Sequence, residues 1–186
     1  MSGRTVPRPS RPQLDARRVD EWLRELDLQP QDRVERDGVT SWDLLLDGLR
    51  RFDIAVTIIL APDTALLVWV HYAPALSDGF RKSYRQFLRW NDEYPFIKFA
   101  LSAEDERPVL TTELAPETLD RDRLGLALAR LLAVCDTLLD ESAHWLWLGG
   151  RRPDQSDRVC RNPALQARYA AQLGELAQPS AGRLEG

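Results

Sequence analysis

The chain has 186 residues, of which 44% are hydrophobic and 29% charged, and its formal net charge at pH 7 is −4. These values are ordinary for one globular domain with tails, and a chain of this length buries a core without disulfide or metal staples. The nearly balanced charge argues against a nucleic-acid binder with a strongly basic face. The lack of any run of about 18 apolar residues argues against a membrane span.

The cysteine pattern bears on the compartment. Cys135 lies in a helical apolar pattern, which is typical of a core thiol, and Cys160 lies in a polar stretch. We therefore expect no disulfide framework and a reducing compartment. The N-terminus also lacks the apolar core of a signal peptide. Together these features predict a cytoplasmic protein with no membrane partner.

The first part of the chain predicts an arm and a helix. Residues 1–13 are rich in proline and arginine and carry too little apolar surface to offset the entropy of ordering, so we expect a disordered arm. Asp15 is suited to cap a helix. The helix is predicted from one apolar face at helical spacing, formed by Val19, Trp22, Leu23 and Leu26.

Three alternating runs then predict three strands, at 42–46, 52–60 and 66–72. The dipeptides at 47–48 (Asp-Gly) and 62–63 (Pro-Asp) predict the turns between them. Both faces of the third strand are apolar. One face must meet helices, and the other must meet something else, such as a second subunit or a bound segment.

A helix-to-strand corner follows. Ser77 or Asp78 is suited to cap the helix, and Pro95 ends it, because the residue before a proline is pushed to extended geometry. Asn91 is expected to satisfy backbone groups at the helix end. The predicted apolar face of the helix is Phe80, Tyr84, Phe87 and Leu88, and that of the strand is Ile97, Phe99 and Leu101.

The rest of the chain predicts an acidic hairpin tip at 104–106, a fifth strand at 109–114 and a long helix from Thr118 or Asp120 to about Glu141. Beyond the aromatic segment 144–148 we expect a linker at 149–161. Asn162-Pro163 then opens an amphipathic helix at 162–177, before a flexible tail at 178–186.

The order of elements is α-β-β-β-α-β-β-α plus a C-terminal helix. It predicts a single α+β domain at 14–148, with an antiparallel five-stranded sheet and helices packed on one side.

No local motif predicts catalysis, a cofactor or a metal site. The chain has neither a phosphate-binding loop nor a dinucleotide-binding glycine pattern. His71 and His144 are its only histidines, and neither has a histidine or cysteine close by in the sequence. His71 suits a half-buried position at a strand end, and His144 suits a helix C-terminus, where a protonated ring faces the negative end of the dipole. We therefore expect a protein that is not an enzyme.

Six tryptophans are many for this length. Trp22 and Trp42 fall on patterned faces and read as core. The other four fall off the predicted stripes or near a helix end, and tryptophan is favoured at interfaces because it buries a large area with few torsions. The candidate partner-binding residues are therefore Trp69, Trp90, Trp145 and Trp147, together with His71.

The segment 90–99, Trp-Asn-Asp-Glu-Tyr-Pro-Phe-Ile-Lys-Phe, resembles the YbjN family of bacterial proteins, which is related in fold to type III secretion chaperones. The match continues through 107–114 and the leucine-rich helix and covers roughly residues 14–142. The resemblance implies an α+β sheet with helices on one side, commonly paired as a homodimer. It also implies binding of extended client segments along apolar patches, and it implies no reaction.

Two departures from the family pattern are the arm at 1–13 and the helix after Asn162. Whether that helix covers the patch on which a chaperone would hold its client is left open by the sequence.

Two functions are consistent with these patterns. The first is a non-enzymatic, homodimeric protein-binding module that uses apolar sheet or helix surfaces. The second is a small-ligand-binding sensor, or an uncharacterised enzyme, with a pocket between the sheet and the long helix. Trp69, His71 and Asn91 are the candidates to line such a pocket.

Overall fold

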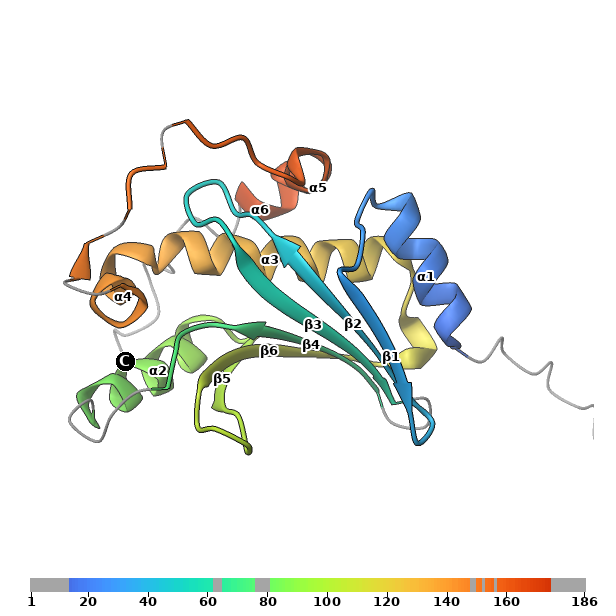
Figure 1. Ribbon diagram of the computed structural model, residues 1–186, viewed down its shortest axis with the longest axis horizontal. Helices are drawn as coiled ribbons and strands as arrows, with labels where there is room; N and C mark the ends of the chain where they lie inside the picture. Colours follow the sequence, from blue (N-terminus) through green and yellow to red (C-terminus); the bar gives the residue numbers. More distant parts are fainter. Residues whose placement is uncertain are drawn as a thin grey trace, which may run out of the picture.

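A computed structural model of the chain describes residues 14–61, 65–75, 81–147, 150, 151, 153–155 and 157–174. The predicted arm at 1–13, the turn at 62–63, the cap at Ser77 or Asp78, the apolar residue Phe80 and the tail at 178–186 lie outside these residues. Figure 1 shows the course of the chain. The elements are α1 (Ala16–Glu25), β1 (Asp32–Arg36), β2 (Val39–Leu46), β3 (Ile54–Ala61), β4 (Ala65–His71), α2 (Arg81–Glu93), β5 (Lys98–Leu101), β6 (Pro108–Leu114), the 3-10 turn η2 (Pro116–Thr118), α3 (Arg121–Thr137), α4 (Leu139–Leu146), α5 (Pro163–Arg168) and α6 (Ala170–Gly174).

The sheet is antiparallel throughout, with the strand order β1-β2-β3-β4-β6-β5. It has six strands, so the prediction of five was wrong. The missed strand is β1, whose five residues are all exposed and show no apolar alternation. The signal that could have found it is the dipeptide Asp37-Gly38. Both residues have positive φ, 52° and 78°, as a two-residue hairpin turn requires.

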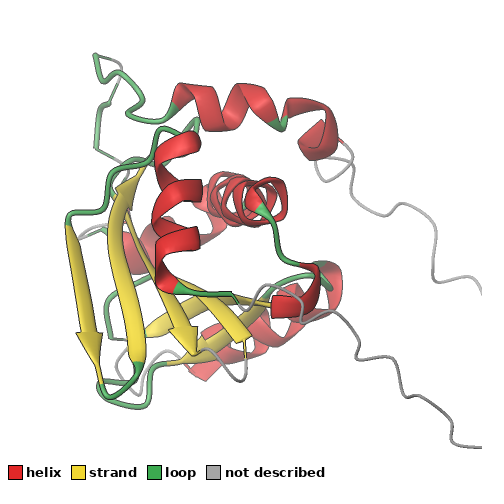
Figure 2. Cartoon of the chain, turned by 90° about the vertical axis from the view of Figure 1, so that its right-hand side faces the viewer, coloured by secondary structure: helices red, strands yellow, loops and turns green. Residues whose placement is uncertain are grey.

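The two faces of the sheet differ sharply. Along β2, β3 and β4 every second residue is buried, and these residues point toward the helices. Figure 2 shows the described helices gathered on that one side, so the prediction of helices on one side is confirmed. The other side has no described helix over it and is called the uncovered face below.

The helix starts follow the predicted caps. The carboxylate of Asp15 accepts a hydrogen bond from the backbone N–H of Arg18 at 2.9 Å, and that of Asp120 accepts one from Arg123 at 2.8 Å. The long helix is shorter than predicted, since α3 ends at Thr137 and α4 begins at Leu139. At this break the Thr137 hydroxyl donates to the carbonyl of Ala133 at 2.9 Å, a back-bond that favours bending.

Five aromatic side chains pack together at the helix-to-strand corner. We call them the aromatic cluster: Tyr72, Phe87, Trp90, Phe99 and Trp145. Neighbouring ring centroids in this cluster are 4.9 to 6.4 Å apart. Because Trp90 is buried in this cluster, the predicted apolar face of α2 was wrong.

The side chain of Leu88, predicted to be core, is instead 69% exposed. The core stripe of α2 runs through Ser83, Phe87 and Trp90 at i, i+4 and i+7. Leu88 is turned about 100° away from Phe87. Leu101, at the end of the edge strand, is also exposed rather than buried with Ile97 and Phe99.

The described C-terminal residues form two short helices, and not the single helix predicted at 162–177, because the helix is interrupted at Tyr169. Both contact α3. The Tyr169 hydroxyl approaches α3 so closely that a Cβ at Gly125 would lie 2.3 Å from it, and it donates to Asp122 at 3.2 Å. Glycine at position 125 is therefore what lets this contact form.

Candidate functional site

The centre of the uncovered face is apolar. The strand register places Ile59 of β3 opposite Leu67 of β4, and Trp69 lies on the same face one row further along. All three side chains are only half-buried. In the same row Ser41 of β2 lies next to Ile59, and Val34 of β1, which is 45% exposed, lies beyond Ser41. An outward sheet face is usually polar, so this strip is not explained by the fold alone.

A chain of hydrogen bonds borders the strip. The hydroxyl of Thr57 donates to the carboxylate of Asp43 at 2.7 Å and lies 3.0 Å from Nε2 of His71. A hydroxyl has one proton, so Thr57 accepts from His71 when it donates to Asp43. This arrangement orients the imidazole and places its proton on Nε2. The uncovered face thus has an aromatic and aliphatic centre with a polar rim, the usual anatomy of a protein-binding patch.

The structure separates the five candidate partner-binding residues. Trp69 and His71 lie together on the uncovered face. Trp147 lies just past the end of α4, where it is half-buried. Trp90 and Trp145 belong to the aromatic cluster and are 1% and 7% exposed, which leaves almost no surface for a partner to contact. Trp90 fell off the predicted stripe because the helix phase was wrong, and Trp145 does lie near a helix end but is buried there.

Asn91 has a different partner from the predicted one. Its side-chain oxygen accepts the backbone N–H of Phe99 at 2.6 Å, and its side-chain nitrogen donates to the carbonyl of Phe99 at 3.2 Å. Asn91 therefore satisfies the outer edge of β5 and joins α2 to the sheet. It does not cap the end of its own helix.

The three residues predicted to line a pocket between the sheet and the long helix do not meet there, because Trp69 and His71 lie on the uncovered face and Asn91 bonds Phe99 of β5. His71 does line a cavity of about 580 Å³, and Trp147 lines it too. Arg51 is buried in its wall. One guanidinium nitrogen of Arg51 donates to the carbonyl of Tyr72 at 2.5 Å, and the other terminal nitrogen has no partner among the described residues. This cavity brings together two of the five candidates.

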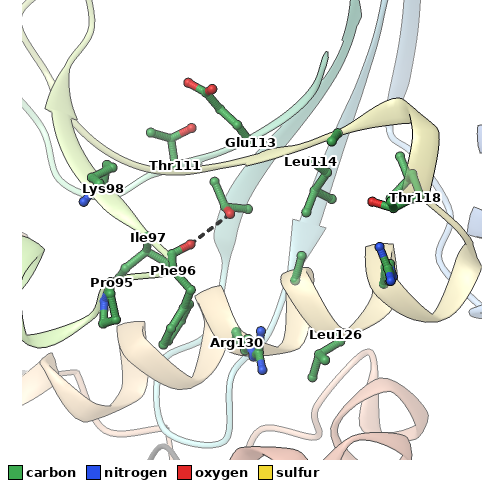
Figure 3. A pocket seen from close by; sticks show the side chains of 15 residues that line it. Pro95, Phe96, Ile97, Lys98, Thr111, Glu113, Leu114, Thr118, Leu126 and Arg130 are labelled. Carbon is green, nitrogen blue, oxygen red and sulfur yellow. Dashed lines mark hydrogen bonds between the residues drawn. The ribbon is translucent and has the colours of Figure 1, made fainter. Parts of the chain in front are cut away.

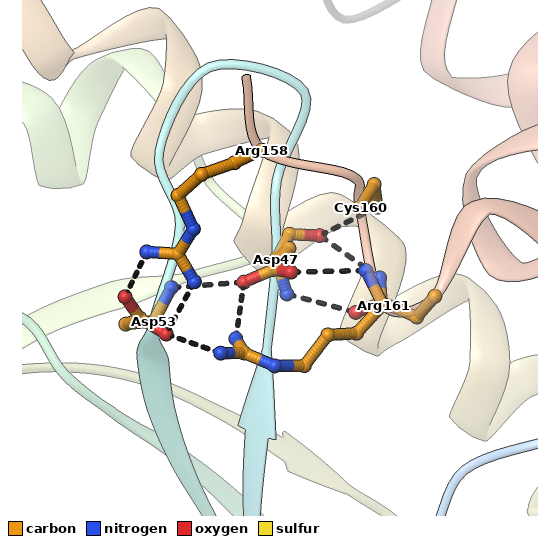
Figure 4. A network of polar contacts seen from close by, with 6 residues as sticks. Asp47, Asp53, Arg158, Cys160 and Arg161 are labelled. Atoms are coloured by element: carbon orange, nitrogen blue, oxygen red, sulfur yellow. Dashed lines mark hydrogen bonds and ion pairs between the residues drawn. The ribbon is translucent and has the colours of Figure 1, made fainter. Parts of the chain in front are cut away.

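A buried carboxylate anchors the segment that follows α4. Asp47, in the connection between β2 and β3, is fully buried. Its carboxylate accepts from the backbone N–H and the guanidinium of Arg161, at 2.9 and 2.7 Å. Asn162 exchanges two hydrogen bonds with the backbone of Asp47, at 2.8 and 2.9 Å. Figure 4 shows Arg158 and Arg161 meeting Asp47 and Asp53 from the C-terminal segment.

Asp53 completes this anchor. Both terminal nitrogens of Arg158 bond its carboxylate, and Arg161 adds a contact at 2.6 Å. The hydrogen bond from Arg158, together with those of Arg161, holds the pKa of Asp53 well below its usual range, against the opposing effect of partial burial.

Asp136, near the end of α3, binds the same β2–β3 connection from the helix side of the sheet. Its carboxylate accepts three successive backbone N–H groups, from Leu49, Arg50 and Arg51, at 2.6 to 2.9 Å. Burial raises the pKa of Asp136, and the three amides oppose that rise. The connection is thus fixed between α3 on one side and the C-terminal segment on the other.

No group of three or more histidine, cysteine, aspartate or glutamate side chains among the described residues is placed to hold a metal ion. Among the same residues, no helix combines the length and apolar character that a membrane span needs. Cys135, predicted to be a core thiol, is fully buried, and burial raises the pKa of its thiol to about 11.

A family model named YbjN, described as a "putative bacterial sensory transduction regulator", matches residues 15–143. The chain belongs to the YbjN family. No curated protein matches it. The YbjN match ends before the segment at 150–174, so that segment is an addition to the matched region. Because α5 and α6 contact α3, on the helix side of the sheet, they leave the uncovered face free.

Proposed function

We propose that this YbjN protein is a non-enzymatic regulator that binds a protein through the uncovered face of its sheet. The observation that carries the proposal is the strip of Ile59, Leu67 and Trp69 on a face with no described helix over it. Contiguous apolar surface of this kind marks interaction sites in soluble proteins. The family description as a sensory transduction regulator supports a role in regulation.

The arrangement of the strip favours a macromolecular partner over a small molecule. The cavity beside His71 is not lined by Ile59, Leu67 or Trp69, whereas small ligands bind in concave sites. Trp69 stands at the centre, and the hydrogen-bonded Thr57 and His71 stand beside it. A tryptophan surrounded by polar groups is the typical energetic centre of a protein interface.

A second copy of the chain is the occupant that we expect first. Two such faces would pack as aligned sheets and bury both strips. The protein would then be a cytoplasmic homodimer, with any further client bound at the rim of the paired faces.

Replacing Trp69 tests this proposal. Light scattering at micromolar concentration should give a dimer for the unmodified chain. Trp69→Glu should shift it to monomer, because a carboxylate would then have to be buried without a partner. Leu88→Glu is the matched control, since Leu88 is an exposed apolar residue on α2. A strict monomer before substitution, or equal effects of both substitutions, would contradict the dimer.

The cavity beside His71 and Trp147 favours a second candidate function, a small-ligand sensor. Its volume of about 580 Å³ is within the range of ligand sites, and the buried Arg51 in its wall has an unpartnered donor. A thermal-shift screen with anionic metabolites should raise the unfolding midpoint if the cavity binds one of them. The rise should vanish in Trp147→Ala. A uniform lack of shift across the library would leave protein binding as the better-supported function.

A further inference from the structure

A groove of about 730 Å³ lies along the edge of the sheet, between β6, the corner before β5, and α3. It exists because β5 is short. β5 begins only at Lys98, which pairs with Thr111, so the part of β6 beyond Thr111 has β4 on one side and, among the described residues, no strand partner on the other. The corner turns toward α3 instead, and the hydroxyl of Thr112 holds it by donating to the carbonyl of Phe96 at 2.9 Å.

The walls of the groove are mostly apolar on the side that faces the helix. Figure 3 shows Phe96, Leu114 and Leu126 around this space, whereas Lys98 and Glu113 point away from α3. The helix α3 contributes a stripe at i, i+3, i+4 and i+7, formed by Arg123, Leu126, Ala127 and Arg130. Two arginines therefore stand about 10 Å apart along the helix, with apolar side chains between them.

No ion pair joins Arg123 or Arg130 to an acidic group of the described residues. Arg123 lies in the first turn of α3, where the helix dipole disfavours a cation. By contrast, Arg121 in the same turn pairs with Glu25 at 3.0 Å and with Asp122 at 3.1 Å. Arg123 thus remains a cation without a structural partner in this part of the chain.

Arg130 is held in a defined orientation. Its guanidinium lies 5.2 Å from the ring centroid of Phe96, in a cation–π contact. Its Nε is buried, and among the described residues it has no hydrogen-bond partner. A buried donor without a partner is costly, so an acceptor bound here would be favoured. The planar edge of a guanidinium suits a carboxylate or phosphate, which it binds with two parallel hydrogen bonds.

We propose that this groove is a binding site for a small amphipathic organic anion, with its acidic head on Arg130 and its apolar body along Leu126 and Leu114. The volume is that of a small-ligand site. An added peptide strand fits less well, because the part of β6 that β5 leaves unpaired is only the three residues Thr112 to Leu114. The site is separate from the protein-binding face and does not depend on it.

Calorimetric titration of the full chain with decanoate, decyl phosphate, decanol and acetate tests the site. Decanoate or decyl phosphate should bind with a stoichiometry of one, and the tighter of the two identifies the head group. Decanol and acetate, which lack the head or the body, should each bind at least about tenfold more weakly. Equal binding of decanoate and decanol, or binding of none of the four, would overturn the proposal.

Arginine variants locate the site. Arg130→Gln should weaken binding by about tenfold or more. The affinity of Arg130→Lys should lie between those of the wild type and Arg130→Gln, because lysine keeps the charge and loses the paired donors. Arg89→Gln is the matched control, since Arg89 is exposed on α2 and does not line the groove. Unchanged affinity in Arg130→Gln, with a wild-type thermal unfolding curve, would overturn the assignment. Trp69→Glu should bind the anion normally, so failure here is distinct from failure of the protein-binding proposal.

Discussion

Asn91 shows how one side chain can replace a strand. By meeting both the N–H and the carbonyl of Phe99, its amide supplies the two hydrogen bonds that a neighbouring backbone would make. The sequence pattern around Pro95 was therefore informative, but its explanation was not local. Asn91 bonds to a residue eight positions away, across the proline turn, and not to the end of its own helix.

Substitution of Asn91 should therefore cost stability out of proportion to its size. Asn91→Ala leaves two backbone groups of Phe99 without their partners, and we expect a loss of about 1–3 kcal/mol in the free energy of unfolding. Urea denaturation measures it. The neighbouring Asp92, which is exposed, gives the control Asp92→Ala, for which we expect a change within about 0.5 kcal/mol. Equal losses in the two variants would show that the amide is not what holds β5.

Residue-level predictions succeeded where the determinant was local. The caps at Asp15 and Asp120 bond amides three residues away, within the same turn. The roles of Trp90 and Trp145 could not be read in this way. Whether α2 buries the face with Leu88 or the face with Trp90 depends on where α4 lies. The ring of Trp145, on α4, packs against Phe87 and Trp90 only because the tertiary fold brings α4 beside α2.

At the level of elements, the connection between β2 and β3 is the point at which the C-terminal segment is fixed. Asp47 and Asp53 receive Arg158, Arg161 and Asn162 from more than 100 residues away in sequence. Such a contact leaves no local pattern, and Asn162 was accordingly expected only as a helix cap. In the structure its side chain makes no cap hydrogen bond and bonds Asp47 instead.

The ionisation of Asp53 makes this anchor sensitive to acid. The pKa of Asp53 is lowered in the folded protein, so its contribution to stability is complete above the ordinary value of 3.8. That contribution decreases as the pH falls below this value and is lost once the folded-state carboxyl is protonated. The stability difference between the wild type and Asp53→Asn, from urea denaturation, should be constant near neutral pH and shrink below about pH 4.

Salt and a second variant provide the control for this pH dependence. Because Asp53 is partly exposed, the difference should also shrink at high ionic strength. A change at Asp43, which bonds a hydroxyl and no arginine among the described contacts, should not reproduce the same acid profile. A difference that persists unchanged to pH 2 would contradict the assignment to Asp53.

Elements were predicted well where apolar periodicity was strong, as in α1, β3 and β4. β1 was missed for the opposite reason, since its burial is uniform and its side chains are mostly charged. The groove beside β6 could not be predicted either. It depends on β5 beginning only at Lys98, opposite Thr111, while β6 continues to Leu114, and strand pairing is not visible in a single strand's pattern.

At the scale of the whole molecule, the helices leave one face of the sheet uncovered, and the C-terminal addition packs on the opposite side. The order of the elements was enough to predict an α+β domain with helices on one side. What covers the other face is not encoded in periodicity, because a half-buried strand face looks the same in sequence whether its partner is solvent or protein. The two proposed surfaces share one strand, since β6 runs along the groove and also lies within the sheet whose face is uncovered.

The edges of the sheet carry a consequence for self-association. A free strand edge invites another chain to continue the sheet, which leads to open-ended aggregates. Asn91 occupies the edge at β5, and the edge at β1 is short, fully exposed and rich in Asp, Arg and Glu. Both ends of the sheet thus discourage growth by strand addition. Under the dimer proposal, association should therefore proceed face to face and stop at a closed pair, and it should not extend into a fibre.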